Sequence, residues 1–84
     1  MTKAELMIED FKKNNIVTVA GAIYLSLYEC KYWQEFVDSK NNFLRIVIRY
    51  DDCSWLFIHR NGKVKTLIKG KFVNELNLYT YKED

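Results

Sequence analysis

The stretch that decides the fold is Phe43–Lys69, FLRIVIRYDDCSWLFIHRNGKVKTLIK. Apolar and polar residues alternate along three runs in it, and a period of two is typical of strands with one buried face. Asn61-Gly62 lies between the second and third runs and predicts a two-residue type I′ hairpin. A second two-residue turn at Asp51-Asp52 would join the first two runs. The stretch therefore predicts three antiparallel strands.

These turns divide the side chains between two faces, because opposed residues of an antiparallel pair share a face. The first predicted face holds Leu44, Ile46, Ile48, Tyr50, Cys53, Trp55, Phe57, His59, Val64, Thr66 and Ile68. The second, the basic face, holds the cations Arg45, Arg49, Arg60, Lys63, Lys65 and Lys69. Between these cations runs an apolar stripe of Val47, Leu56, Ile58 and Leu67. We expect the first face to form the core, with Trp55 and Phe57 largely buried, and the basic face to be exposed.

An amphipathic helix is predicted before this sheet. Thr2 and Glu5 have the spacing of a capping box, in which each side chain accepts from the other residue's backbone N–H. Apolar residues then follow at helical spacing, namely Ala4, Met7, Ile8 and Phe11. Asn14-Asn15 suits a left-handed helix stop.

Residues 16–38 allow several interpretations. Ile16–Val19 fits a short strand, and from Ala20 to Val37 the apolar residues recur at threes and fours, which favours helix. A break near Ser26 would give two short helices, whereas the alternation over 23–28 is typical of a strand. One helix, two helices, or a strand followed by a helix all remain open. Asp38–Asn42 is a loop by composition.

A fourth strand is predicted over Phe72–Tyr81, but its register stays open. A two-residue loop at Gly70-Lys71 would put Phe72, Leu76 and Leu78 on the basic face, and a three-residue loop would move them to the core face. The predicted fold class is α+β, with one or two N-terminal helices packed on a three- to four-stranded antiparallel β-meander. Residues 1–84 show neither repeat nor linker and are expected to form a single domain.

Composition bounds the class of protein. The formal net charge is only +2, so any electrostatic role depends on how the charges are distributed. No apolar run approaches the roughly 20 residues of a membrane span, the N-terminus is not signal-like, and two cysteines without a CxxC are expected to be reduced. These features predict a cytoplasmic protein without a membrane partner. The abundance of Lys, Asn, Ile, Tyr and Phe suggests AT-rich codons and an origin in a phage or mobile element.

Catalytic, metal and cofactor sites are not expected. His59 is the single histidine, and the nearest thiol, Cys53, would lie about 20 Å away along the same predicted strand, at about 3.3 Å per residue. A Cys–His pair needs contact near 3 Å. Asp51-Asp52 suits a turn better than a metal site, and the three glycines form no phosphate-binding loop.

Residues 18–37 resemble a helix-turn-helix, with Ala22 in the tight crossing position. With a downstream hairpin, this arrangement would be similar to a winged helix. The second helix would present Glu29, Glu35 and Asp38 against one cation, whereas groove-reading helices usually carry Arg, Lys, Asn or Gln. DNA binding through this helix is therefore not the favoured interpretation.

The basic face is the favoured functional surface. Its like charges lie close together, which costs stability unless an anion is present, and an apolar centre with a charged rim is the anatomy of a protein interface. We predict a small non-enzymatic binding protein, an inhibitor or modulator of a host complex, that engages an acidic partner through the ten residues of the basic face and its stripe. The alternatives are nucleic-acid binding, by the same face or by the helix-turn-helix, and a homodimer that buries the apolar stripe.

Overall fold

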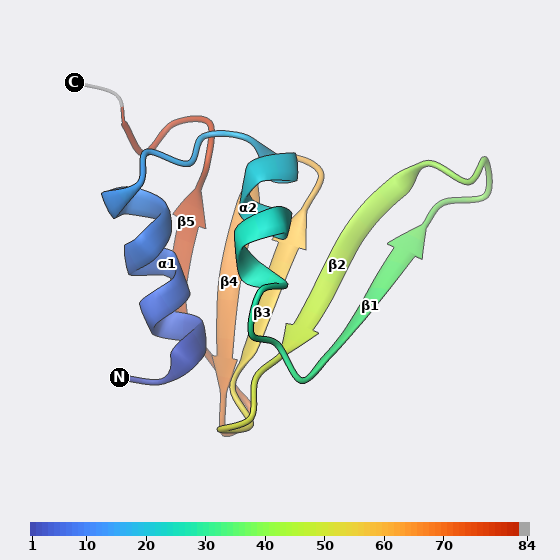
Figure 1. Ribbon diagram of the computed structural model, residues 1–84. Helices are drawn as coiled ribbons and strands as arrows, with labels where there is room; N and C mark the ends of the chain where they lie inside the picture. The colour runs from blue at the N-terminus through green and yellow to red at the C-terminus, as the bar shows by residue number, and fades with distance from the viewer. Residues whose placement is uncertain (83–84) are drawn as a thin grey trace.

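The computed structural model describes residues 1–82 and shows two helices followed by an antiparallel sheet (Figure 1). The elements in chain order are α1 (Lys3–Lys13), α2 (Val19–Ser26), β1 (Tyr32–Val37), β2 (Phe43–Arg49), β3 (Trp55–His59), β4 (Lys63–Ile68) and β5 (Lys71–Asn77). The strands pair in sequence order, β1-β2-β3-β4-β5, as a meander, and both helices lie on one face of it. The predicted α+β class with an antiparallel sheet is confirmed, but the described residues form five strands rather than three or four.

Helix α1 begins and ends where the sequence predicts. The capping box is present, with the backbone N–H of Thr2 donating to Glu5 Oε1 at 2.9 Å. Asn15, just after the helix, has φ +56°, the left-handed conformation of a helix stop. Helical spacing places Ala4, Ile8 and Phe11 on the buried side of the helix. This side therefore packs against the sheet.

Helix α2 is short and is held at both ends. The Thr18 hydroxyl accepts from the backbone N–H of Gly21 at 3.0 Å, which caps the first turn. At the other end, the hydroxyl of Tyr50 donates to the carbonyl of Ser26 at 3.0 Å. Tyr50 is buried, and burial raises the pKa of its hydroxyl. The phenol therefore stays protonated and ties the end of α2 to the end of β2.

The core lies between the helices and one face of the sheet, which we call the core face. The buried apolar side chains of this cluster are Ala4, Ile8, Phe11, Ala22, Ile46, Ile48, Tyr50, Leu56, Ile58, Val64, Leu76 and Leu78. Every strand from β2 to β5 contributes to it. The β1–β2 hairpin projects beyond the helices, to the right in Figure 1.

The prediction of helix through Val37 is wrong, because the chain leaves α2 at Ser26 and residues 32–37 form edge strand β1. Five of the six side chains of β1 are exposed and the sixth is half-buried. Both faces of this strand therefore contact water, and no apolar-polar alternation marks it in the sequence. The predicted helix-turn-helix over residues 18–37 does not form, since its second helix is replaced by this strand.

Both predicted two-residue turns around β3 are three-residue loops. In the first, Asp51–Cys53, the N–H of Tyr50 donates to the carbonyl of Ser54 at 2.9 Å, and Cys53 has φ +69°. In the second, 60–62, the N–H of Gly62 donates to the carbonyl of His59 at 2.9 Å, and Gly62 has φ +89°. Each matches the common hairpin in which a turn is followed by a left-handed residue.

The extra residue in each loop turns β3 over. Leu56 and Ile58 are fully buried in the core face, so the prediction that they form part of an exposed stripe is wrong. Trp55, Phe57 and His59 instead point to the opposite face, where they are half-buried, so their predicted place in the core is also wrong. Strands β2 and β4 keep their predicted faces, because the two one-residue shifts cancel across β3.

The register of β5, which the sequence leaves open, combines both alternatives. Lys69 and Gly70 have φ +52° and +79°, and Ile68 pairs with Lys71, which makes a two-residue type I′ turn. The register then shifts by one residue, so that Val73 forms a bulge. Phe72, before the bulge, therefore faces away from the helices, whereas Leu76, after it, is buried in the core face.

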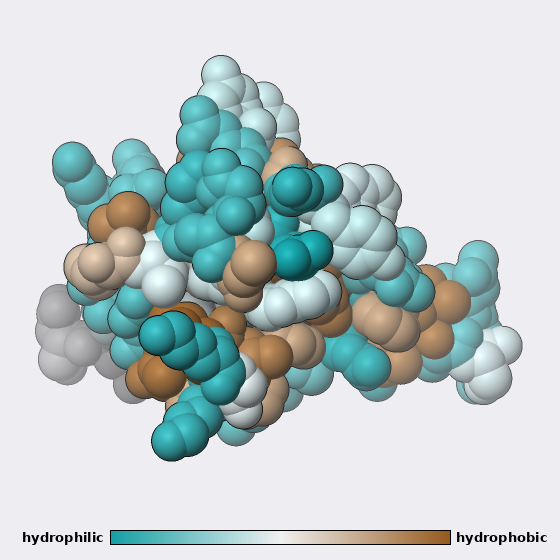
Figure 2. Space-filling view, turned by 90° about the horizontal axis from the view of Figure 1, so that it is seen from below, coloured by the Kyte–Doolittle hydropathy of each residue, from teal (hydrophilic) through white to brown (hydrophobic). Residues whose placement is uncertain are grey.

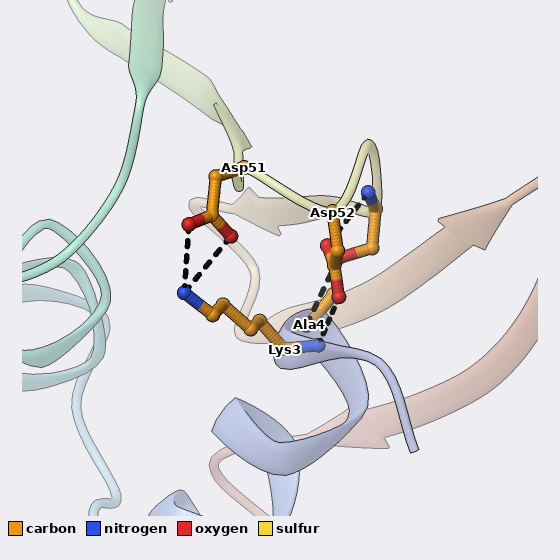
Figure 3. A network of polar contacts seen from close by, with 5 residues as sticks. Lys3, Ala4, Asp51 and Asp52 are labelled. Carbon is orange, nitrogen blue, oxygen red and sulfur yellow. Dashed lines mark hydrogen bonds and ion pairs between the residues drawn. The ribbon is translucent and has the colours of Figure 1, made fainter.

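The loop between β2 and β3 also caps α1 (Figure 3). Asp52 Oδ2 accepts from the backbone N–H of Lys3 at 2.8 Å, and Ser54 Oγ accepts from that of Ala4 at 3.2 Å. The Lys3 ammonium lies 2.8 Å from the Asp51 carboxylate. The first N–H groups of a helix have no partner within the helix. This loop supplies two of those partners and fixes α1 to the sheet.

Candidate functional site

The face of the sheet turned away from both helices carries the candidate site. We call it the open face. Its side chains, assigned by strand register, are Tyr32, Gln34, Phe36, Arg45, Val47, Arg49, Trp55, Phe57, His59, Lys63, Lys65, Leu67, Phe72, Glu75 and Asn77. Seen from below, along the strands, hydrophobic and hydrophilic side chains are interspersed over this end of the molecule and along the projecting hairpin (Figure 2).

The open face is organised in rows that cross the sheet, because paired residues on neighbouring strands lie side by side. One row crosses every strand and consists of Tyr32, Arg49, Trp55, Leu67 and Phe72. The next consists of Gln34, Val47, Phe57, Lys65 and Glu75. A third begins with Phe36, Arg45 and His59. Each row thus contains at least one cation and one aromatic ring.

The cations lie against the rings. Three cation–π pairs form, with these distances from cation to ring centroid: Arg45 over Phe36 at 4.3 Å, Lys65 over Phe72 at 5.5 Å, and Arg49 over Trp55 at 5.8 Å. Phe57 also meets Phe72 edge to face, with centroids 5.5 Å apart. Exposed pairs of this kind contribute about 0.5–1 kcal/mol each. These contacts hold the long side chains along the surface.

Positive charge on this face is mostly unpaired. Lys63 forms an ion pair with Glu75 at 3.3 Å. Arg45, Arg49 and Lys65 have no carboxylate within ion-pair distance among residues 1–82. A guanidinium nitrogen of Arg49 instead donates to Cys53 Sγ at 3.3 Å. The face therefore presents three cations that are free to meet an anion.

His59 lies among these cations. Its partial burial, and then the charges of Arg45, Lys65 and Lys63, hold the pKa of the imidazole below its ordinary value. Arg45 is its neighbour on β2, and the two lysines lie on β4. A protonated imidazole would add a positive charge beside these cations, which disfavours protonation, so His59 is neutral at pH 7.

The predicted site residues do not all come together. Arg45, Arg49, Lys63, Lys65, Val47 and Leu67 lie on the open face. Arg60 and Lys69 lie instead in the loops at opposite ends of β4, and Arg60 contacts Asp38 at 3.5 Å. Leu56 and Ile58 are in the core, as described above.

Sequence reasoning missed the aromatic part of the site. The predicted two-residue turns put Trp55 and Phe57 in the core, because their strand alternates equally well either way and only the loop lengths decide its orientation. Tyr32 and Phe36 were assigned to a helix. Cys53, the last residue of the first loop, has a left-handed backbone. Gly or Asn is usual at such a position, so a cysteine there does not indicate a three-residue loop.

Residues 1–82 contain no group of three or more His, Cys, Asp or Glu side chains arranged to hold a metal ion. Cys30 is half-buried, Cys53 is exposed, and both are free thiols. Over the same residues, no helix has the length and apolar character needed to cross a membrane.

Comparisons of the chain with protein-family models, with curated protein sequences and with solved structures found no match.

Proposed function

We propose that this protein is a small non-enzymatic binding protein that engages an acidic macromolecular partner through the open face. One observation carries the proposal. Arg45, Arg49 and Lys65 lie unpaired among exposed or half-buried rings on a face that neither helix covers. The three cations are spread over β2 and β4 of the same face, so an extended anion laid across the sheet can meet more than one of them. Two guanidinium groups in the set also suit bidentate contact with carboxylate or phosphate.

Retention on a heparin column tests this function with a general polyanion. The double variant Arg45→Glu with Lys65→Glu lowers the formal net charge from +2 to −2, as does the control Lys12→Glu with Lys13→Glu on exposed positions of α1. We expect the first variant to elute at much lower salt than the second. Equal elution would mean that retention follows net charge alone, and the proposed function would be wrong. Circular dichroism checks that both variants stay folded.

Several finer predictions accompany this function. A cytoplasmic location is supported by the two free thiols, which suit a reducing compartment. An origin in a phage or mobile element, and a role as inhibitor or modulator of a host complex, rest on size and composition only. We do not propose the homodimer through the apolar stripe, because Leu56 and Ile58 of that stripe lie in the core.

A further inference from the structure

We infer that the acidic partner is a single-stranded nucleic acid, whose bases stack on the aromatic rings of the open face while its phosphates contact the cations. The inference rests on the proposed function and names the partner class for the same surface. It is carried by the orientation of β3, which brings Trp55 and Phe57 to this face in place of Leu56 and Ile58.

The placement of the cations argues against a protein partner. Protein interfaces have a centre depleted in charged residues and a polar rim. On the open face, Arg49 lies between Tyr32 and Trp55 in one row, and Lys65 lies beside Phe57 in the next. Cations therefore occupy inner strands of the sheet, beside the rings. This alternation matches surfaces that bind single strands, where a positively charged groove follows the backbone and rings accept the bases.

The aromatic residues at both ends of one row are exposed. Phe72 is 59% exposed and Tyr32 is 47% exposed, at opposite ends of one row. Trp55, between them in the row, is half-buried. A shallow hollow of about 250 Å³ adjoins Phe72 and is lined by Lys65, Val73, Asn74 and Glu75. It is smaller than the roughly 300 Å³ lower limit of small-molecule pockets, and it combines a ring with a cation.

Duplex DNA fits the structure less well. Its bases are stacked on one another, so exposed rings gain contact only with unpaired bases. Reading a groove requires an element that enters it, and α2, with the sequence VAGAIYLS, carries no charged residue. The cations of α1 nearest its end, Lys12 and Lys13, lie on the helical layer, away from the open face.

Titration with a fluorescein-labelled oligothymidylate tests the inference. The informative variant is Phe72→Leu, which keeps an apolar side chain at an exposed site and removes the ring. Its matched control is Tyr28→Leu, which removes a ring that is 84% exposed and lies outside the open face. Loss of one stacking ring is expected to weaken binding about tenfold, so we expect that loss for Phe72→Leu and none for Tyr28→Leu.

A second measurement uses tryptophan fluorescence in a Trp33→Phe background, which leaves Trp55 as the one tryptophan. We expect oligothymidylate to quench the fluorescence of Trp55. We expect a DNA duplex of the same length to bind more weakly. Equal affinity of Phe72→Leu and wild type, or equal affinity for duplex and single strand, would overturn the inference.

The heparin experiment separates the two levels of the argument. If heparin retention depends on Arg45 and Lys65 but oligothymidylate does not bind, the proposed function stands and the inference of a single-stranded partner is wrong. If the binding of neither heparin nor oligothymidylate depends on these two residues, the proposed function fails as well.

Discussion

The Asp52 carboxylate caps helix α1 by accepting the backbone N–H of Lys3 at 2.8 Å. The two residues are far apart in the chain, and this contact joins the N-terminus to the loop between β2 and β3 (Figure 3). Partial burial alone would raise the pKa of Asp52, but hydrogen bonds from Ser54 and from Lys3 outweigh it and hold the pKa below its ordinary value of 3.8. The charged form is therefore stabilised by folding.

Replacing Asp52 with Ala should lower the free energy of unfolding by about 1 kcal/mol, the usual cost of a lost helix cap. The control, Asp51→Ala, removes the same charge but only an exposed ion pair with Lys3, so its effect should be smaller. A depressed pKa stabilises the fold above the unfolded value and loses that effect as the pH falls through the folded value. The deficit of Asp52→Ala, measured by urea denaturation, should therefore shrink below about pH 4. Equal deficits for both variants would contradict this capping role.

The orientation of β3 can be tested by truncating neighbours on its two faces. Leu56 is fully buried, and Leu56→Ala should lower the free energy of unfolding by about 2–5 kcal/mol. Trp55 is half-buried on the open face, so Trp55→Ala should cost less in spite of the larger side chain removed. Chemical denaturation measures both. The reverse order would mean that β3 faces the other way.

The left-handed backbone of Cys53, at φ +69°, disfavours any residue with a Cβ atom. Cys53→Gly should therefore raise the free energy of unfolding by about 1 kcal/mol. Cys53→Ala keeps the Cβ atom and loses the same contact with Arg49, so it should bring no such gain. Thermal unfolding distinguishes the two, and equal melting temperatures would argue against the three-residue loop.

His59 should make stability depend on pH near neutrality. Its folded pKa lies below the ordinary value of 6.5, so between these two pKa values the unfolded chain binds more protons than the folded one. Stability is then fully present above about pH 6.5 and declines as the pH falls below it. His59→Gln should lose this part of the decline between pH 7.5 and 5.5, in urea denaturation. An identical decline in both proteins would show that folding does not lower the pKa of His59.

Salt dependence counts the phosphates that the open face neutralises. For a single strand, log K falls with log salt at a slope of about −0.7 for each phosphate contact. Lys65→Gln should therefore make the slope for oligothymidylate shallower by about 0.7, while Lys12→Gln should leave it unchanged. Fluorescence anisotropy at several salt concentrations gives both slopes. An unchanged slope for Lys65→Gln would remove this cation from the site.

Local signals predicted the elements that depend on local contacts. The capping box of Thr2 and Glu5 and the left-handed Asn15 need only near neighbours in the chain, and α1 follows from them. The alternation in β2 and β4 also gave the correct faces. The four cations on these strands were thus assigned to the face on which the structure has them, namely Arg45, Arg49, Lys63 and Lys65.

Features set by non-local packing were not predictable in the same way. Alternation gives the period of β3 but not its direction, which depends on one residue in each adjoining loop. The bulge at Val73 shifts the register within β5, so neither simple loop length describes that strand. Strand β1 has water on both sides, and its sequence carries no periodic signal.

The paired loops around β3 limit which insertions and deletions the chain can accept. Loss of one residue from Asp51–Cys53 alone would turn β3, β4 and β5 over relative to β2 and expel half of the core. Loss of one residue from both this loop and the loop at 60–62 would turn over β3 alone, burying Trp55 and Phe57 and exposing Leu56 and Ile58. A one-residue length change in the loop at 38–42 would turn over only β1, whose two faces are both exposed to water, so the core would stay intact. Related chains should therefore vary in length at residues 38–42 and keep the other two loops constant.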